Sequence, residues 1–196
     1  SGYFLLNNHF CSDLSGLIKD SSGLQIRLTT NQDFTSQANW RKTESFVGQS
    51  LLMEFGCHCA SVLFYLKPDA VFRVDNVNMA RNRVHISLVD DLNINHSIEL
   101  EAGSIAVRKS VFELTVHDRD RTVDFDWYTF SVTDRATGKS TSKSLASEGV
   151  NVPTYLRGNE YSVEIQKLLG LTPKPADERN LGIRVDQFVA SVEEMA

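Results

Sequence analysis

The sequence TESFVGQSLLMEF, residues 43–55, joins a polar segment to an apolar run and has the layout of a phosphate-binding loop. The pattern of such a loop is G-x-x-x-x-G-K-[ST], followed by a helix. Gly48 and Ser50 match this pattern, whereas Thr43 stands at the first glycine and Gln49 at the lysine. In such a loop, backbone N–H groups at a helix N-terminus bind the anion, Gly48 permits close approach, and Ser50 could reach Mg²⁺. The alternative is an ordinary loop before a core helix, and the residues leave both interpretations open.

The residues after this loop predict the central helix of the fold. Between residues 49 and 65, apolar side chains recur at steps of three and four, which places them on one face of a helix. The segment Lys67-Pro68-Asp69 ends the pattern. The positions on the apolar face are Leu51, Leu52, Phe55, Cys59, Val62 and Leu63.

Short runs of alternating apolar and polar residues predict strands on both sides of this helix. One run, 24–29, precedes the loop, and residues 134–139 carry a hairpin-turn signal. Strands so closely spaced are typical of an antiparallel sheet. The runs after the helix are 70–74, 83–89, 97–101, 105–116 and 123–132.

The C-terminal part changes to a helical period, over residues 159–171 and 178–195. We therefore predict an α+β fold, with a largely antiparallel β-sheet packed on a central helix and with C-terminal helices. Residues 1–196 are expected to form a single domain, in which residues 1–22 are a peripheral N-terminal segment. The chain lacks an initial Met and its last helical pattern runs to the end, which favours an N-terminal lobe of a larger protein.

The composition excludes several classes of protein. A hydrophobic content of 41% and a charged content of 23% are ordinary for a globular domain. The net charge of −5 provides no general basic surface for nucleic acid. No apolar run approaches the roughly 18–20 residues of a membrane helix, so no membrane partner is expected, and the cytoplasm is the expected location.

Several polar clusters in the sequence are candidates for a site. His9, Cys11, Cys57, His58 and Cys59 have ligand types that suit zinc. Their single-residue spacings are not those of a usual zinc site, and cysteines in an apolar helix are usually buried, so no metal site is assigned. Residues 133–141 contain Gly-Lys-Ser and precede a polar segment, which favours a turn. Residues 84–91 favour a half-exposed strand over a Mg²⁺-binding one. The charges of residues 117–126 favour a solvated loop with surface ion pairs, and no residue is assigned as catalytic.

Several segments, taken in order, resemble the N-terminal head lobe of SMC-like, coiled-coil ABC-type ATPases. Residues 23–26 look like the strand that leads to their phosphate loop, and residues 47–55 look like the loop and helix start of that family. Residues 84–132, with Arg108-Lys109-Ser110-Val111, resemble their antiparallel subdomain. Residues 168–171 resemble the segment before the coiled coil, and residues 184–188 the loop that carries a Mg²⁺-positioning Gln.

The resemblance implies a degenerate nucleotide-binding lobe from a DNA-maintenance, DNA-repair or phage-defence protein. It makes Gly48, Gln49, Ser50 and Gln187 the nucleotide contacts, with ATP and Mg²⁺ as cofactors. The lysine and the second lobe are absent, so the chain is at most a P-loop ATPase lobe with impaired hydrolysis. A missing second lobe or another protein is the expected partner, with DNA bound only indirectly.

A second hypothesis is a non-catalytic, β-rich structural or protein-interaction module, in which the helix at residues 49–65 simply covers the sheet. The order of residues 48–50, a β-rich insert and then Gln187 favours the ATPase lobe.

Overall fold

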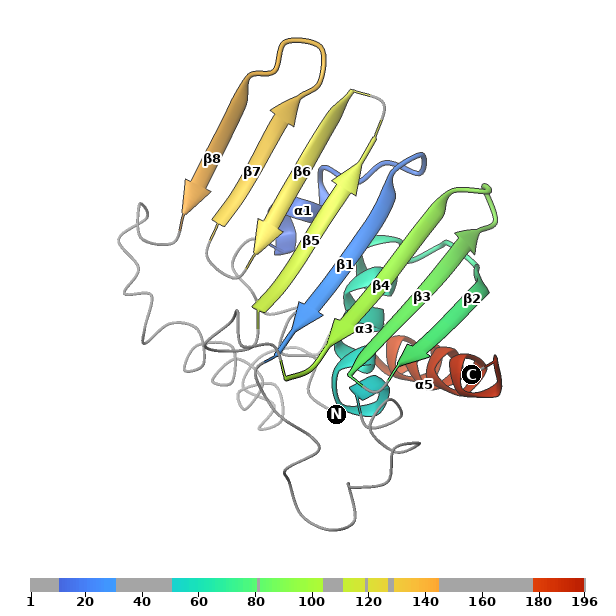
Figure 1. Cartoon of the computed structure of the whole chain (residues 1–196). Coiled ribbons are helices and arrows are strands. Elements are labelled where there is room, and N and C mark those ends of the chain that lie inside the picture. Colours follow the sequence, from blue (N-terminus) through green and yellow to red (C-terminus); the bar gives the residue numbers. More distant parts are fainter. Residues whose placement is uncertain are drawn as a thin grey trace, which may run out of the picture.

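The computed structural model describes residues 11–30, 51–80, 82–103, 111–118, 120–126, 129–144 and 178–195. These residues form one eight-stranded sheet with helices packed on one of its faces (Figure 1). The strand order is β2-β3-β4-β1-β5-β6-β7-β8. The predicted α+β fold, with a largely antiparallel sheet on a central helix and a helix at the C-terminal end, is confirmed.

The helices are α1 (Cys11–Ser15), the π-helical turn η3 (Leu52–Gly56), α3 (Cys57–Leu66) and α5 (Glu178–Met195). The strands are β1 (Gly23–Thr29), β2 (Phe72–Ala80), β3 (Arg83–Asp90), β4 (Asn95–Glu101), β5 (Val111–His117), β6 (Arg121–Asp126), β7 (Thr129–Asp134) and β8 (Ser140–Ser144). No helix in the described ranges is long and apolar enough to cross a membrane.

All neighbouring strands are antiparallel except β1 and β4, which run parallel. β1 lies at the centre, where Ile26 is in register with Ile98 of β4 and Leu114 of β5. The sheet therefore has four strands on each side of the line between β1 and β5.

The period-two pattern of each central strand separates the two faces of the sheet. In β1, Leu24, Ile26 and Leu28 are buried among the helices, whereas Gln25 and Arg27 point to the opposite, open face. α3 and α5 pack against each other beneath the β2-β3-β4-β1 half. Burial of the apolar residues on this one face, which include Leu63, Ile86, Leu100 and Val192, is the main stabilising term.

The structure corrects several predicted boundaries. The central helix contains a π-helical turn at Leu52–Gly56, after the helical Leu51, and the strand predicted at 70–74 extends to Ala80. The single strand predicted at 123–132 is the two strands β6 and β7, which pair with each other. The hairpin turn at 134–139 is confirmed, with Gly138 at φ 67°. The predictions at residues 43–50, 105–110 and 159–171 lie outside the described residues.

Candidate functional site

The start of α3 is unusual because a π-helical turn precedes it. Residues Leu52–Gly56 form this turn, and Cys57-His58-Cys59 follow at once. A Cβ on Gly56 would lie 2.7 Å from Leu52 Cδ1 and 3.6 Å from Leu100 Cδ1, so only glycine fits here without a shift of a side chain. π-helical turns inside helices are rare and frequently mark functional sites.

His58, in the first turn of α3, is a titratable group that lies two residues after this π-helical turn. It is half-buried, and burial lowers its pKa from 6.5 to about 4. The Ser61 hydroxyl donates to the His58 carbonyl oxygen at 2.7 Å, which holds the backbone of this turn. His58 is therefore a neutral imidazole at neutral pH, able to accept a proton at one ring nitrogen and to donate one from the other.

The other three described histidines differ from His58 in location, burial and hydrogen bonding. His85 lies on the open face of the sheet, 3.3 Å from the Ser87 hydroxyl through Nε2. His117 is exposed at the end of β5. His96 is fully buried and fixed on both ring nitrogens. His58 combines a strongly lowered pKa with partial access to solvent, a combination typical of acid–base sites.

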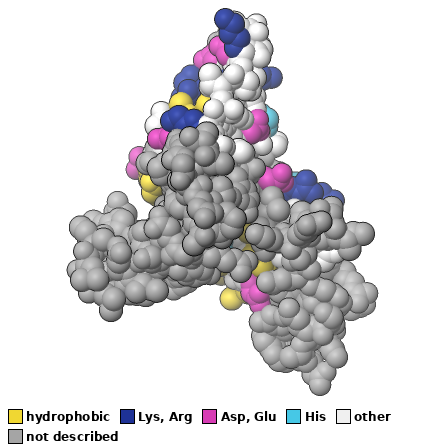
Figure 2. Space-filling view, turned by 90° about the vertical axis from the view of Figure 1, so that its left-hand side faces the viewer, with side chains coloured by type: hydrophobic (Ala, Val, Ile, Leu, Met, Phe, Trp, Pro, Cys, Tyr) yellow, Lys and Arg dark blue, Asp and Glu magenta, His cyan; other side chains and the backbone are white. Residues whose placement is uncertain are grey.

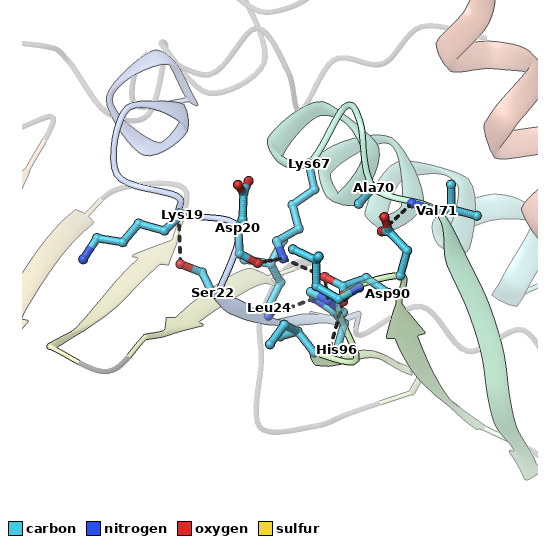
Figure 3. A network of polar contacts seen from close by, with 12 residues as sticks. Lys19, Asp20, Ser22, Leu24, Lys67, Ala70, Val71, Asp90 and His96 are labelled. Atoms are coloured by element: carbon cyan, nitrogen blue, oxygen red, sulfur yellow. Dashed lines mark hydrogen bonds and ion pairs between the residues drawn. The ribbon is translucent and has the colours of Figure 1, made fainter.

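A buried polar network lies at the opposite end of α3 (Figure 3). Lys67 Nζ donates to Asp90 Oδ2 at 2.9 Å and to the Asp20 carbonyl oxygen at 2.7 Å. His96 Nε2 lies 3.1 Å from the same Asp90 oxygen. The side chains of Lys67, Asp90 and His96 are 5%, 1% and 0% exposed.

The hydrogen bonds of this network define the tautomer of His96. The Leu24 backbone N–H donates to His96 Nδ1 at 3.2 Å, so the proton of the neutral ring is on Nε2 and is donated to Asp90. Burial lowers the pKa of His96, which keeps the ring neutral. For Asp90, burial raises the pKa, but hydrogen bonds from Lys67, the Ile94 backbone N–H and His96 outweigh it and hold the pKa at about 2.

The network joins parts of the chain that are distant in sequence. Asp90 Oδ1 also accepts the backbone N–H groups of Leu92 and Ile94 at 3.0 and 2.8 Å. The network thus ties the end of α3 to β1, β3 and β4, with all four acceptor positions of the carboxylate used. We interpret it as structural, since its buried polar atoms bond to one another and to the backbone; Lys67 and Asp90 also line a hollow of about 270 Å³.

This network was not among the predicted sites, although the sequence carries a signal for it. Asp90 follows Val84, Ile86 and Leu88 on the inward side of β3, and His96 precedes Ile98 on the inward side of β4. A polar residue at an inward position of an alternating strand is buried, and a buried polar residue needs partners.

Of the four predicted nucleotide contacts, the structure describes one. Gly48, Gln49 and Ser50 lie outside the described residues. Gln187 lies inside α5, not in a loop, and its exposed side chain lines a hollow of about 570 Å³ beside Phe64 and Arg184. The Arg184 guanidinium stacks on the Phe64 ring at 4.4 Å.

The cysteines of α3 do not form a metal site with other described residues. No group of three or more His, Cys, Asp or Glu side chains suited to a metal occurs in the described ranges. Burial raises the pKa of the Cys57 and Cys59 thiols, which disfavours the thiolate that binds metal.

Comparison with known proteins gives structural relatives only. No family model and no curated protein matches the sequence. The fold is similar to an NAD-binding oxidoreductase from Klebsiella pneumoniae, with a TM-score of 0.70 and 12% identity over 99% of this chain and 63% of that chain. It is similar to GenD2 from gentamicin A biosynthesis in complex with NAD, at TM-score 0.69 and 9% identity over 100% of this chain and 60% of that chain.

A third similar structure is the UDP-N-acetylglucosamine 3-dehydrogenase GnnA from Acidithiobacillus ferrooxidans. Its TM-score is 0.67, with 13% identity over 100% of this chain and 60% of that chain. The chain spans about three fifths of the length of these solved structures. At these identities the likeness shows the fold.

These matches correct the resemblance stated above. The fold belongs with oxidoreductase structures, so the assignment to an SMC-like ABC ATPase head lobe is wrong. The predictions that depended on this assignment are also wrong, because the matched proteins are oxidoreductases described with NAD or NADPH. These are the predictions of ATP and Mg²⁺ as cofactors, of a DNA-repair or phage-defence role, and of an impaired ATPase. The alternative of a β-rich interaction module does not account for the matches better.

The described residues do not fit a dinucleotide site of the doubly wound type. Such a site needs parallel strands and a Gly-x-Gly-x-x-Gly turn at the N-terminus of a helix. In the described sheet only β1 and β4 are parallel, and no two of the 11 glycines in the sequence are separated by a single residue. The pyrophosphate of a dinucleotide therefore has no site of this type in the described part of the chain.

Proposed function

We propose that this chain is the sheet domain of an NAD(P)-dependent oxidoreductase. The observation that carries the proposal is the match of essentially the whole chain, at TM-scores of 0.63–0.70, to several oxidoreductase structures. Because the described fold lacks the dinucleotide-binding architecture, the cofactor is held by a separate domain, in the same polypeptide or in a partner. The domain described here provides the substrate side of the site.

His58 is the proposed acid–base residue of this domain. Interconversion of an alcohol and a carbonyl group requires a proton to leave or reach the substrate oxygen, and a neutral imidazole can take or return that proton. The lowered pKa keeps His58 neutral over the physiological range. The π-helical turn and the Ser61 hydrogen bond hold the backbone from which it projects.

The proposed substrate class is a sugar or other polyol with a secondary alcohol. One similar structure is a UDP-N-acetylglucosamine 3-dehydrogenase, and another comes from gentamicin A biosynthesis. Sugar nucleotides and amino sugars are therefore the first substrates to test.

The binding test compares nicotinamide and adenine nucleotides. The melting temperature of the complete natural protein is measured with NADH, NADPH and ATP-Mg²⁺. A ligand at 100 times its Kd stabilises the folded state by about 2.7 kcal/mol, so NADH or NADPH should raise the melting temperature by several degrees. A shift with ATP-Mg²⁺ and none with either nicotinamide cofactor would overturn the proposal.

A further inference from the structure

Two hollows that share one wall lie at the C-terminal end of α3. The shared wall is Pro68, Asp69 and Ala70, in the loop from α3 to β2. It separates the hollow of about 570 Å³ beside α5 from the hollow of about 270 Å³ beside the turn between β3 and β4. Arg184 of α5 holds this loop, because its guanidinium donates to the Pro68 and Ala70 carbonyl oxygens. The two hollows together form the α3–β2 groove, which crosses a fixed ridge.

The larger hollow of the groove has apolar walls. Phe64, Phe72 and Phe188 line it, and the Phe64 ring meets the other two edge to face, with ring centroids 5.6 and 6.0 Å apart. Val71 on its rim is 70% exposed, the largest exposed fraction among the described large apolar side chains. A partner that covers this apolar surface gains free energy by removing it from water.

The smaller hollow of the groove is lined by carboxylates that lack a counter-charge. Asp20, Asp69 and Asp91 are exposed, and no ion pair to them occurs among the described residues. Both lysines of this hollow already pair with other carboxylates, Lys19 at 3.1 Å and Lys67 at 2.9 Å. In Figure 3 the Lys19 side chain points away from Lys67. The smaller hollow therefore presents a net negative charge to a partner.

The opposite edge of the sheet has no comparable apolar surface in the part of the chain that the structure describes. Figure 2 faces the β8 edge, and hydrophobic side chains are few among its coloured atoms. None of the described large apolar side chains that are exposed lies in β5, β6, β7 or β8. Apolar contact with a partner is therefore favoured at the α3–β2 groove over the β8 edge.

We propose that the α3–β2 groove binds a short extended segment of another protein that carries one basic and one aliphatic side chain. The smaller hollow takes the lysine or arginine, whose charge meets Asp20 and Asp91 and whose apolar stem lies along Leu92, which is 56% exposed. The larger hollow takes the aliphatic side chain, beside Val71. Arg184 lines the larger hollow and repels a basic group there, which disfavours the reverse orientation.

The length of the ridge limits the spacing of the two side chains on the partner. The three ridge residues reach at most about 10 Å. An extended segment advances about 3.1–3.4 Å per residue, so it crosses the ridge in two to four residues. The segment needs few contacts beyond these two side chains, so a reversible complex that weakens with salt is expected.

The test titrates the full chain with synthetic peptides and follows backbone amide signals by NMR. Each capped peptide contains one lysine and one leucine, separated by one, two or three glycines. We expect one spacing to bind most tightly and to shift the amide signals of Val71 and Leu92. With leucine replaced by glycine, or lysine by glutamate, this peptide should bind at least about tenfold more weakly.

Charge reversal on the protein tests the smaller hollow. Asp69→Lys and Asp91→Lys, made singly, should each raise the Kd of the lysine peptide at least about tenfold. Glu193→Lys is the control, because Glu193 is an exposed charge of α5 outside the lining of the groove, and it should bind like the wild type. The double variant Asp69→Lys/Asp91→Lys should prefer the glutamate peptide. This reversed preference is decisive, because a misfolded groove binds neither peptide.

Four results would each overturn the proposal. They are no binding of any lysine–leucine peptide by the wild type, wild-type affinity in both single variants, equal affinity for the peptide without leucine, and self-association of the wild type that Asp91→Lys abolishes. The third result would show a simple cation site, and the fourth a second copy of this chain in the groove. If a reversal variant fails to fold, Asp69→Asn and Asp91→Asn replace it, with a smaller increase in Kd expected for each.

The peptide proposal is independent of the proposed function. The groove lies at the C-terminal end of α3, about 14 Å along the helix from His58 in its first turn. Peptide binding without nicotinamide-dependent turnover, or turnover without peptide binding, would therefore separate the two proposals.

Discussion

At the scale of single residues, His58 makes a prediction about pH and stability. Its pKa is about 4 in the folded chain and about 6.5 when unfolded, so the unfolded state binds more protons between these values. The contribution to stability is therefore complete above pH 6.5 and is lost as the pH falls to 4, by at most about 3.4 kcal/mol. His58→Gln should flatten this part of the stability–pH curve, measured by urea unfolding.

The exposed His117 provides the matched control for this experiment. His117→Gln makes the same substitution at an exposed position and should change the free energy of unfolding by less than about 0.5 kcal/mol. An equal slope for His58→Gln and the wild type would contradict the buried, neutral state of His58.

Asp90 makes the second prediction at this scale. Asp90→Asn leaves the Lys67 ammonium buried without its counter-charge, which typically costs about 3–5 kcal/mol. The neighbouring Asp91 is exposed, and among the described residues it accepts the Val71 backbone N–H alone, so Asp91→Asn should cost less than about 1 kcal/mol. Chemical unfolding of both variants measures the difference. Similar losses for the two would show that the network does not act as described.

At the scale of elements, the π-helical turn before α3 makes a prediction about Gly56. Gly56→Ala places a methyl group 2.7 Å from Leu52 Cδ1 and should cost about 1–3 kcal/mol by overpacking. In a Leu52→Ala background the same substitution should cost much less, because the clashing atom is gone. The four proteins of this double-mutant cycle are compared by unfolding. An equal cost of Gly56→Ala in both backgrounds would place the strain elsewhere.

Most elements were predictable because they follow local periodicity. The alternation of β3 and the three- and four-residue steps of α3 are properties of adjacent residues. The pairing of β1 with β4 was not predictable, since it joins residues about 70 positions apart in the opposite sense to the other pairs. The buried Asp118 was also missed, because its partners, the backbone N–H groups of Asp120 and Arg121, are not visible in the composition of a charged segment.

At the scale of the whole molecule, the predicted ATPase function was wrong because it rested on a short motif and not on the topology of the sheet. Residues 48–50 suggested a phosphate loop, but a motif acquires meaning only from the strand and helix around it. The eight-stranded sheet, antiparallel except for one central pair, aligns with oxidoreductase structures over the whole chain. His58 was visible in the sequence, yet neither the π-helical turn nor its burial could be read there.

The most direct test of the account is nicotinamide-dependent turnover by the complete natural protein, with and without His58. Wild-type protein, His58→Gln and the control His117→Gln are assayed with NAD⁺ and NADP⁺ on sugar nucleotides and amino sugars. Loss of a general acid–base residue costs about 10²–10⁴-fold in rate, so we expect that loss for His58→Gln and wild-type turnover for His117→Gln. Wild-type kcat/KM should also fall below pH about 4, as His58 becomes protonated. Turnover by His58→Gln at the wild-type rate would contradict the account.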